Sequence, residues 1–160
     1  MISDPRSVRD EIHQTRPFHS LAEETVVALM RTTSIVRRAC GKMVESFGIS
    51  LAQYNVLRIL RGAGEDGLPT LGVRDRLVEE APGITRLIDK LEKAKLVRRD
   101  RMGRDRRTVR VHITSAGTAL LGRMEHLVPR FEERISVGLP DERDQQALLD
   151  LLSRVRAGND

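Results

Sequence analysis

The hydrophobic period of the chain changes near residues 96–97, and this change limits the folds that the sequence can form. Before it, apolar residues recur at spacings of three and four, which predicts a helix with one buried side. These residues are Ile84, Leu87, Ile88 and Leu91. After it, apolar and polar residues alternate from Val109 to Ile113, which predicts a strand with one covered face. Arg110 and His112 are expected on the outer face of that strand.

A β-hairpin is expected to join this strand to an extended segment at residues 97–99. The residues between them, 100–106, contain Gly103 and can turn the chain. Four arginines lie in or beside this turn: Arg101, Arg104, Arg106 and Arg107. A hairpin that carries these residues at its tip forms a basic wing.

Two short helices are predicted before the hairpin, at about residues 70–93. Thr70 can cap the first, which should extend to about Glu80 with Leu77 as its clearest inward residue. Pro82 fits the first turn of the second helix, where its missing N–H costs nothing. Two short helices joined by a tight turn, the second basic on its outer side, are typical of a helix-turn-helix.

Longer helices are expected on the N-terminal side of this unit. A capping box formed by Ser20 and Glu23 predicts the start of an amphipathic helix that ends at Gly48. A second capping box, formed by Ser50 and Gln53, predicts a shorter helix directly after it.

Two further helices are expected after the predicted strand. Thr114 can cap the first, whose apolar residues extend to Phe131, and Pro129 should kink or break this helix. The second helix follows Leu139. The chain is therefore predicted to be mainly α, with a small β wing.

Positive charge is concentrated in one segment of the chain. The 160 residues have a formal net charge of +5, but residues 86–110 alone carry +7 and the remainder carries −2. A patch of this kind suits a phosphate backbone, and the alternative is a solvated charged face. Because aromatic residues make up only 2%, few side chains could stack on unpaired bases, which favours duplex DNA as the partner.

Several other classes of protein are excluded by the same composition. No apolar run approaches the roughly 18 residues of a membrane span, and the first residues have no apolar segment typical of a secretory signal. One cysteine, Cys40, cannot form an internal disulfide or a structural zinc site. The histidines show no metal-ligand spacing, and no catalytic arrangement is present. We therefore expect a soluble, cytoplasmic protein with no metal, no cofactor and no enzymatic activity.

The sequence from about Leu21 to Arg156 resembles the multiple-antibiotic-resistance regulator (MarR) family of bacterial winged-helix repressors. Three segments carry the resemblance: residues 82–99 (PGITRLIDKLEKAKLVRR), 103–107 (GRDRR) and 109–114 (VRVHIT). They match the family's proline-led helix, its wing and its alternating strand, in that order. Two positions depart from the pattern. Lys95 stands where glycine is common, so a positive φ there would cost about 1 kcal/mol, and Arg74 stands where a small residue is usual.

The resemblance implies a homodimer that represses transcription in response to a ligand. Its architecture would be an N-terminal arm at residues 1–19 and a winged-helix domain at residues 20–158. In that domain, dimerisation helices at about residues 20–47 and 115–156 flank the helix-turn-helix and a wing at about residues 97–113. A two-fold dimer suits a palindromic operator whose half-sites lie about 34 Å apart.

The recognition helix is expected to supply the contacts that read DNA sequence. The candidate residues are Pro82, Gly83, Thr85, Arg86, Asp89 and Lys90. Arg86 is the best candidate for a bidentate contact to guanine, Thr85 can meet a thymine methyl or a phosphate, and Lys90 can hold a phosphate. A solvated helix face is the alternative.

In the wing, the resemblance implies that Asp105 orients Arg107 toward the minor groove. A narrow groove concentrates negative potential, which suits an arginine. Arg104 and Arg106 would add phosphate contacts. The alternative is an Asp105–Arg107 ion pair that only stabilises the hairpin.

The resemblance also implies a crevice for a small aromatic or lipophilic effector. Its candidate lining residues are Cys40, Val44, Phe47, Tyr54 and Leu57, each of which could equally belong to an ordinary core. Two other functions stay open. Cys40 could make the protein a redox-sensing regulator of the same family, or the winged helix could serve protein contacts without reading DNA.

Overall fold

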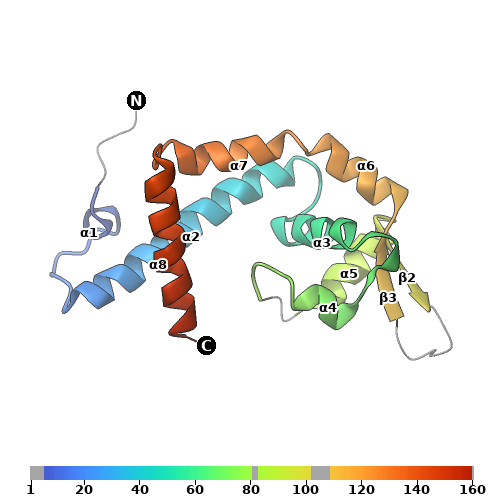
Figure 1. Cartoon of the computed structure of the whole chain (residues 1–160), viewed down its shortest axis with the longest axis horizontal. Coiled ribbons are helices and arrows are strands. Elements are labelled where there is room, and N and C mark those ends of the chain that lie inside the picture. The colour runs from blue at the N-terminus through green and yellow to red at the C-terminus, as the bar shows by residue number, and fades with distance from the viewer. Residues whose placement is uncertain (1–5, 81–82, 102–108, 160) are drawn as a thin grey trace. The chain divides into compact units, whose positions relative to one another are not determined.

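The computed structural model describes residues 6–80, 83–101 and 109–159, apart from the side chain of Arg101. Its helices and strands follow one another along the chain as shown in Figure 1. They are α1 (Val8–Glu11), α2 (Leu21–Glu45), α3 (Leu51–Gly62), a 3-10 turn (Gly64–Asp66), β1 (Leu68–Pro69), α4 (Thr70–Arg74), α5 (Ile84–Lys93), β2 (Val97–Arg101), β3 (Val109–Ile113), α6 (Ser115–Arg123), α7 (Leu127–Ser136) and α8 (Glu142–Ala157). The prediction of a mainly helical chain with a small β wing is confirmed.

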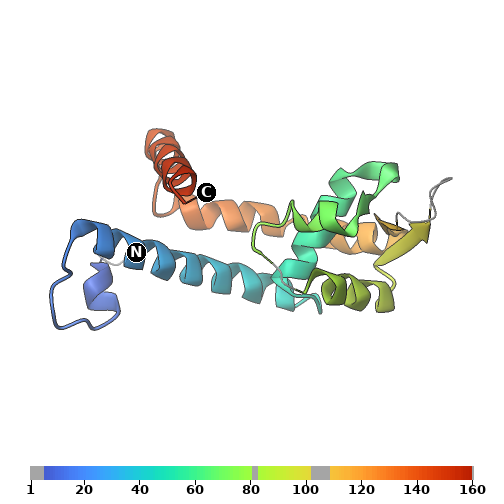
Figure 2. The same ribbon diagram turned by 90° about the horizontal axis from the view of Figure 1, so that it is seen from below.

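The chain divides into two compact units. The winged-helix unit is Arg37–His126, and the terminal-helix unit combines Met1–Val36 with Leu127–Asp160. Both Figure 1 and Figure 2 show α2 as one continuous helix, which begins in the terminal-helix unit and ends in the winged-helix unit.

The core of the winged-helix unit forms around α3. This helix packs against α4, α5, α6 and β3. Its apolar side, Val56, Leu57 and Leu60, is fully buried. The predicted capping box fixes its start: the Gln53 N–H donates to Ser50 Oγ at 3.2 Å, and the Ser50 N–H donates to Gln53 Oε1 at 2.9 Å.

The three strands form an antiparallel sheet in the order β1-β3-β2. The predicted hairpin is present, with Val97 opposite Ile113 and Arg101 opposite Val109. The third strand, β1, was not predicted, because two residues are too short to show an alternating pattern. Proline is tolerated in it because β1 lies at the edge of the sheet.

The predicted orientation of His112 is wrong. Its side chain was expected on the outer face of the strand, but it is only 3% exposed. The imidazole lies against Gly67, which has no side chain to exclude it. His112 is therefore buried together with its neighbour Val111, and its Nε2 atom has no hydrogen-bond partner among the described residues.

Helix α4 is shorter than predicted. It ends at Arg74 instead of near Glu80, and Pro69 takes the N-cap position in place of Thr70. The residue that α4 buries is Val73, whereas Leu77 is half-buried. In the segment after α4, the Val78 N–H donates to Asn55 Oδ1 at 3.1 Å, which ties this segment to α3.

Arg74, the predicted departure from the family pattern on α4, does not disturb packing. Its side chain is exposed and pairs with Asp75 at 3.0 Å. Lys95 has a φ of 59°, as the second departure predicted, and this residue follows the C-terminal end of α5.

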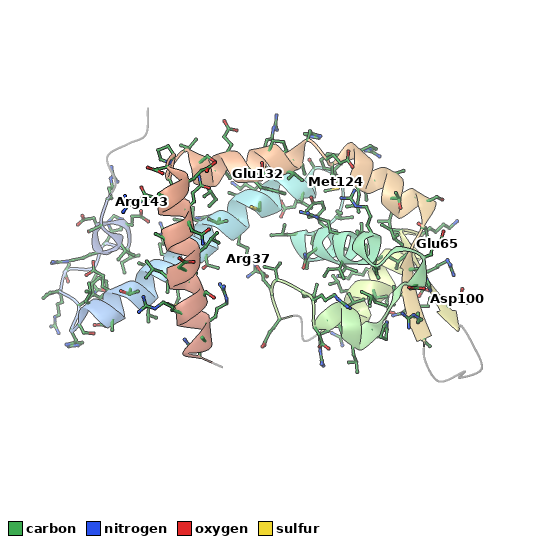
Figure 3. The ribbon with its side chains drawn as sticks, in the orientation of Figure 1. Arg37, Glu65, Asp100, Met124, Glu132 and Arg143 are labelled. Atoms are coloured by element: carbon green, nitrogen blue, oxygen red, sulfur yellow. The ribbon has the colours of Figure 1, made fainter. Side chains whose placement is uncertain are left out.

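The helix predicted after Thr114 is interrupted earlier than expected. Thr114 Oγ1 accepts the Gly117 N–H at 3.1 Å, which confirms the predicted cap. The break falls between α6 and α7, at residues 124–126, and Met124 marks this end of α6 in Figure 3. Pro129 lies in the first turn of α7, where the backbone N–H groups have no partner within the helix and proline is tolerated.

The terminal-helix unit contains α1, the first part of α2, and helices α7 and α8. At the start of α2, the Glu23 N–H donates to Ser20 Oγ as predicted, but the Glu23 carboxylate accepts the N–H of His19 instead of that of Ser20. Large apolar side chains are exposed along this unit: Leu21, Val26, Met30, Ile35, Ile135, Val137, Leu148, Leu149, Leu151 and Val155. Among the described residues, no helix is long and apolar enough to span a membrane.

Candidate nucleic-acid interface

Helix α5 has one buried side and one polar side, as the hydrophobic period predicted. Ile84, Ile88 and Leu91 are buried in the winged-helix unit. The exposed residues of this segment include the described DNA-contact candidates Gly83, Thr85, Arg86, Asp89 and Lys90. The structure thus brings these five candidates to one surface, and their contacts with DNA stay predictions.

The start of α5 is described from Gly83 onward. Gly83 takes the N-cap position, and the helix begins at Ile84. Pro82 itself lies outside the described residues.

Strand β2 packs against α5, and Arg99 connects the two elements. Its Nη2 is 2.6 Å from Asp89 Oδ1, and its Nη1 is 2.5 Å from Glu92 Oε2. The backbone N–H of Arg99 also donates to Glu92 Oε1 at 3.0 Å. Burial lowers the pKa of Arg99, but the hydrogen bonds with Asp89 and Glu92 outweigh it and raise the pKa above its ordinary value.

Two more arginines of the basic segment are bonded within the protein. Arg98 pairs with Asp100, which is labelled on the strand in Figure 3. Arg110 donates from Nε to the Asp66 carbonyl at 2.7 Å and from Nη2 to the Gly67 carbonyl at 3.1 Å. The two Arg110 bonds tie β3 to the segment before β1, whereas the Arg98–Asp100 pair lies within β2 and Arg98 stays exposed. The other exposed cations among the described residues from Ile84 to Val97 are Arg86, Lys90, Lys93 and Lys95.

The four wing candidates, Arg104, Asp105, Arg106 and Arg107, lie outside the described residues. The strands on either side of them are paired, with Asp100 opposite Arg110. The roles predicted for the four residues stay predictions.

The effector candidates all lie in the winged-helix unit. Val44, Tyr54 and Leu57 are buried, and Cys40 and Phe47 are half-buried. The guanidinium of Arg58 lies 5.8 Å from the Tyr54 ring centroid, and that of Arg123 lies 5.9 Å from the Phe47 centroid. Both separations suit cation–π contacts. Neither the effector role of these residues nor a redox role of Cys40 is tested by this arrangement.

An open cavity of about 500 Å³, which the sequence did not predict, lies beside the N-terminal arm and the first turn of α2. It is lined by Ile12, His13, Gln14, Thr15, Arg16, Pro17, His19 and Glu23. No apolar pattern marks this cavity, because most of its lining residues are polar and lie outside a helix. Within the described part of the chain, no group of three or more His, Cys, Asp or Glu residues could hold a metal ion.

A helix-turn-helix followed by a paired β-hairpin defines a winged-helix protein. The chain is 37% identical to a MarR transcription factor from Planctomyces limnophilus, with a TM-score of 0.64, over 86% of this chain and 98% of that one. It is 30% identical over 138 residues to the HTH-type transcriptional regulator YkoM of Bacillus subtilis, which covers 81% of this chain and 88% of YkoM. The protein belongs to the MarR family of DNA-binding HTH-type transcriptional regulators. No family model matches the chain.

Two more distant structures share the fold. The S. aureus MepR–DNA complex is 23% identical with a TM-score of 0.70, over 81% of this chain and 96% of MepR. The organohalide-sensing regulator RdhR in its 2,4-dichlorophenol-bound form is 16% identical with a TM-score of 0.75, over 89% of this chain and 86% of RdhR.

Proposed function

We propose that this protein represses transcription as a homodimer that binds a palindromic operator and releases it when an effector binds. The observation that carries the proposal is the two-sided character of α5. Its apolar side is buried in the winged-helix unit, and its other side exposes Thr85, Arg86 and Lys90. A helix held in this way can enter the major groove without losing its place in the core.

The exposed residues of α5 differ in the DNA contacts that they can make. Arg86 lies in the first turn of α5, where a recognition helix meets base edges, and its guanidinium can donate two hydrogen bonds to one guanine. Thr85 can contact a thymine methyl or a phosphate. Lys90 lies further along the helix and suits a phosphate.

The wing supplies a second contact in this proposal. Asp105 orients Arg107 into the minor groove next to the major groove that α5 enters, while Arg104 and Arg106 hold phosphates. The net charge of +7 on residues 86–110 supports this arrangement, because the segment includes both α5 and the wing.

Dimerisation is supported by the apolar side chains exposed on the terminal-helix unit. On α8 alone, Leu148, Leu149, Leu151 and Val155 are exposed, and further large apolar residues are exposed on α2 and α7. Apolar side chains gathered in this number on a few helices are typical of surfaces that another protein covers. A second copy of the same helices provides a matching apolar surface with two-fold symmetry.

Selection of bound sequences from random duplex DNA, at a stated salt concentration, tests the proposed function. The full-length protein is expected to enrich a palindrome whose half-sites lie about one helical turn apart, roughly 34 Å. Recovery of DNA with no common sequence would contradict operator recognition and would favour a winged helix that serves protein contacts.

The proposed effector is a small aromatic or lipophilic molecule. The RdhR structure that shares this fold contains 2,4-dichlorophenol, which supports a small aromatic ligand for this protein. Cys40, Val44, Phe47, Tyr54 and Leu57 are the residues proposed to line its site. Titration of a chlorophenol into the protein–operator complex is expected to release DNA. A complex that persists with the ligand bound to the protein would contradict this mechanism.

A further inference from the structure

We propose that Arg99 is a positioning residue that fixes the recognition helix relative to the wing, and that Asp89 serves DNA binding through Arg99 instead of contacting a base. This inference rests on the proposed reading of DNA by α5 and the wing. It changes the role of one candidate residue and adds two others, Arg99 and Glu92, that the sequence pattern did not single out.

Arg99 joins β2 to α5, and we call the cluster of Arg99, Asp89 and Glu92 the Arg99 clamp. Asp89 and Glu92 are three residues apart on α5, so their carboxylates lie on the same side of the helix. Arg99 on β2 contacts both, at 2.6 Å and 2.5 Å, and its backbone N–H adds a third bond to Glu92. A guanidinium has a planar set of donors that can hold two carboxylates at once, which an ammonium group cannot match.

The Arg99 side chain is less exposed to solvent than the arginine of a surface ion pair. The Arg99 side chain is only 24% exposed, whereas the paired Arg98 side chain is 53% exposed. A partly buried guanidinium that is bonded to two carboxylates is poorly placed to reach a phosphate. Arg99 therefore contributes to the positive segment without being one of its DNA contacts.

Asp89 is likewise poorly placed to read a base. Its Oδ1 atom is bonded to Arg99, and a carboxylate on a DNA-facing surface repels phosphates unless a cation neutralises it. Arg99 supplies that cation. Loss of Arg99 would leave two acids, Asp89 and Glu92, uncompensated beside the exposed Arg86 and Lys90.

The position of Arg99 in the chain explains how these bonds can affect DNA binding. Strand β2, which carries Arg99, is the first strand of the wing hairpin and ends at Arg101, two residues beyond Arg99. A bond between Arg99 and α5 thus links the angle of the recognition helix to the base of the wing. Discrimination between DNA sequences depends on both elements meeting their grooves together, so it should be more sensitive to this link than total affinity is.

The test compares binding of full-length variants to two duplexes, the sequence enriched by selection and a scrambled sequence of equal length. We define the Kd ratio as Kd for the scrambled duplex divided by Kd for the enriched duplex. For Arg99→Ala we expect this ratio to fall about tenfold, which is the scale of one lost base contact. Binding to the scrambled duplex should weaken, because Asp89 and Glu92 are left uncompensated, but the slope of log Kd against log salt should change by less than the value of about 0.9 that one lost phosphate contact gives. If Arg99 held a phosphate, this slope would fall by about 0.9 on both duplexes, and the proposal would be overturned.

The double variant Asp89→Asn, Glu92→Gln distinguishes two effects of the acids: their role in positioning α5 and their repulsion of DNA phosphates. It removes two negative charges and preserves side-chain shape, so binding to the scrambled duplex should become tighter. The clamp nevertheless loses its ion pairs, and the ratio of the two Kd values should fall as it does for Arg99→Ala. Tighter binding to both duplexes with an unchanged ratio would show that only charge matters and would overturn the proposal.

Two further variants complete the design. Arg61→Ala removes an exposed arginine that pairs with Glu125 at 3.4 Å, and it should leave both Kd values unchanged. Arg99→Lys keeps the charge and should restore part of the lost ratio. Thermal unfolding identifies any variant that is unfolded at the assay temperature. The comparison of Kd values then uses the variants that remain folded. Failure of the wild-type protein to enrich a sequence would instead refute the proposed function, before any variant is compared.

Discussion

The imidazole of His112 on β3 lies against the backbone of Gly67, the residue before β1. A Cβ atom built on Gly67 would stand 2.6 Å from His112 Nδ1 and 2.6 Å from the carbonyl oxygen of Val111. Gly67 also has φ 58° and ψ −166°, a backbone conformation that is essentially restricted to glycine. Gly67 therefore permits both the turn into β1 and the burial of His112.

Gly67→Ala should destabilise the protein strongly. The left-handed backbone and the close contact with His112 each oppose a Cβ atom, and together they should lower the free energy of unfolding by about 2–5 kcal/mol. Denaturant unfolding measures this loss. Gly122→Ala is the control, because Gly122 lies in α6 and a Cβ atom there would meet nothing within 4 Å. A stability loss for Gly67→Ala no larger than that of the control would contradict this account.

Lys95→Gly should stabilise the protein. Lys95 has a φ of 59°, and a side chain in this region costs about 1–2 kcal/mol relative to a residue without a Cβ atom. Part of this gain is offset by the greater flexibility of glycine in the unfolded chain, so an increase of about 1 kcal/mol is expected. Lys90→Gly, in the middle of α5, should instead lower stability by about 1 kcal/mol. Equal effects of the two substitutions would show that Lys95 is unstrained.

Leu149→Asp should dissociate the proposed dimer. Leu149 lies on α8 with 59% of its surface exposed, and an aspartate there would place a charge in the proposed apolar interface. Sedimentation equilibrium measures the mass of the assembly. Leu71→Asp is a matched control, because Leu71 is also 59% exposed but lies on α4 of the winged-helix unit. A dimeric Leu149→Asp protein, or a wild type that is monomeric at micromolar concentration, would contradict the proposed interface.

Arg107→Ala should weaken binding to every duplex and make binding less sensitive to salt. An arginine that neutralises phosphate charge contributes about 0.9 to the slope of log Kd against log salt, and its loss should lower the slope by this amount. Titrations at several salt concentrations provide the measurement. If both affinity and slope stay as in the wild type, Arg107 has no role in the groove, and the alternative of an Asp105–Arg107 ion pair that only stabilises the hairpin would be favoured.

The elements predicted correctly depend on local patterns. The period of Ile84, Ile88 and Leu91 predicts α5 and its two sides, and the Ser50–Gln53 capping box predicts the start of α3. In each case the bonds and the buried side involve residues within one or two helical turns, so the signal is contained in a short stretch of sequence.

The elements predicted wrongly depend on distant residues. Helix α4 ends at Arg74, and the Val78 N–H in the loop after it bonds to Asn55, 23 positions away, a contact that no pattern in the α4 segment shows. The burial of His112 requires Gly67, which lies on the other side of two helices in the sequence. Alternation along a single strand cannot reveal a neighbour of this kind.

The candidate site shows the same limit. The exposed side of α5 could be predicted because it is the complement of the buried side. The contacts of Arg99 with Asp89 and Glu92 could not be predicted, because the sequence shows these residues only as members of a mixed charged segment. Their one visible signal is the spacing of three between two acids on a helix that is followed by a basic strand.

The most direct test of sequence reading by α5 is a second selection from random duplex DNA, carried out with Arg86→Ala. If Arg86 reads a guanine, the variant should lose the preference at one base pair in each half-site and keep it at the others. Affinity for the wild-type sequence should fall by about 1–3 kcal/mol. Recovery of the same palindrome with undiminished preference at every position would contradict the reading of DNA by Arg86.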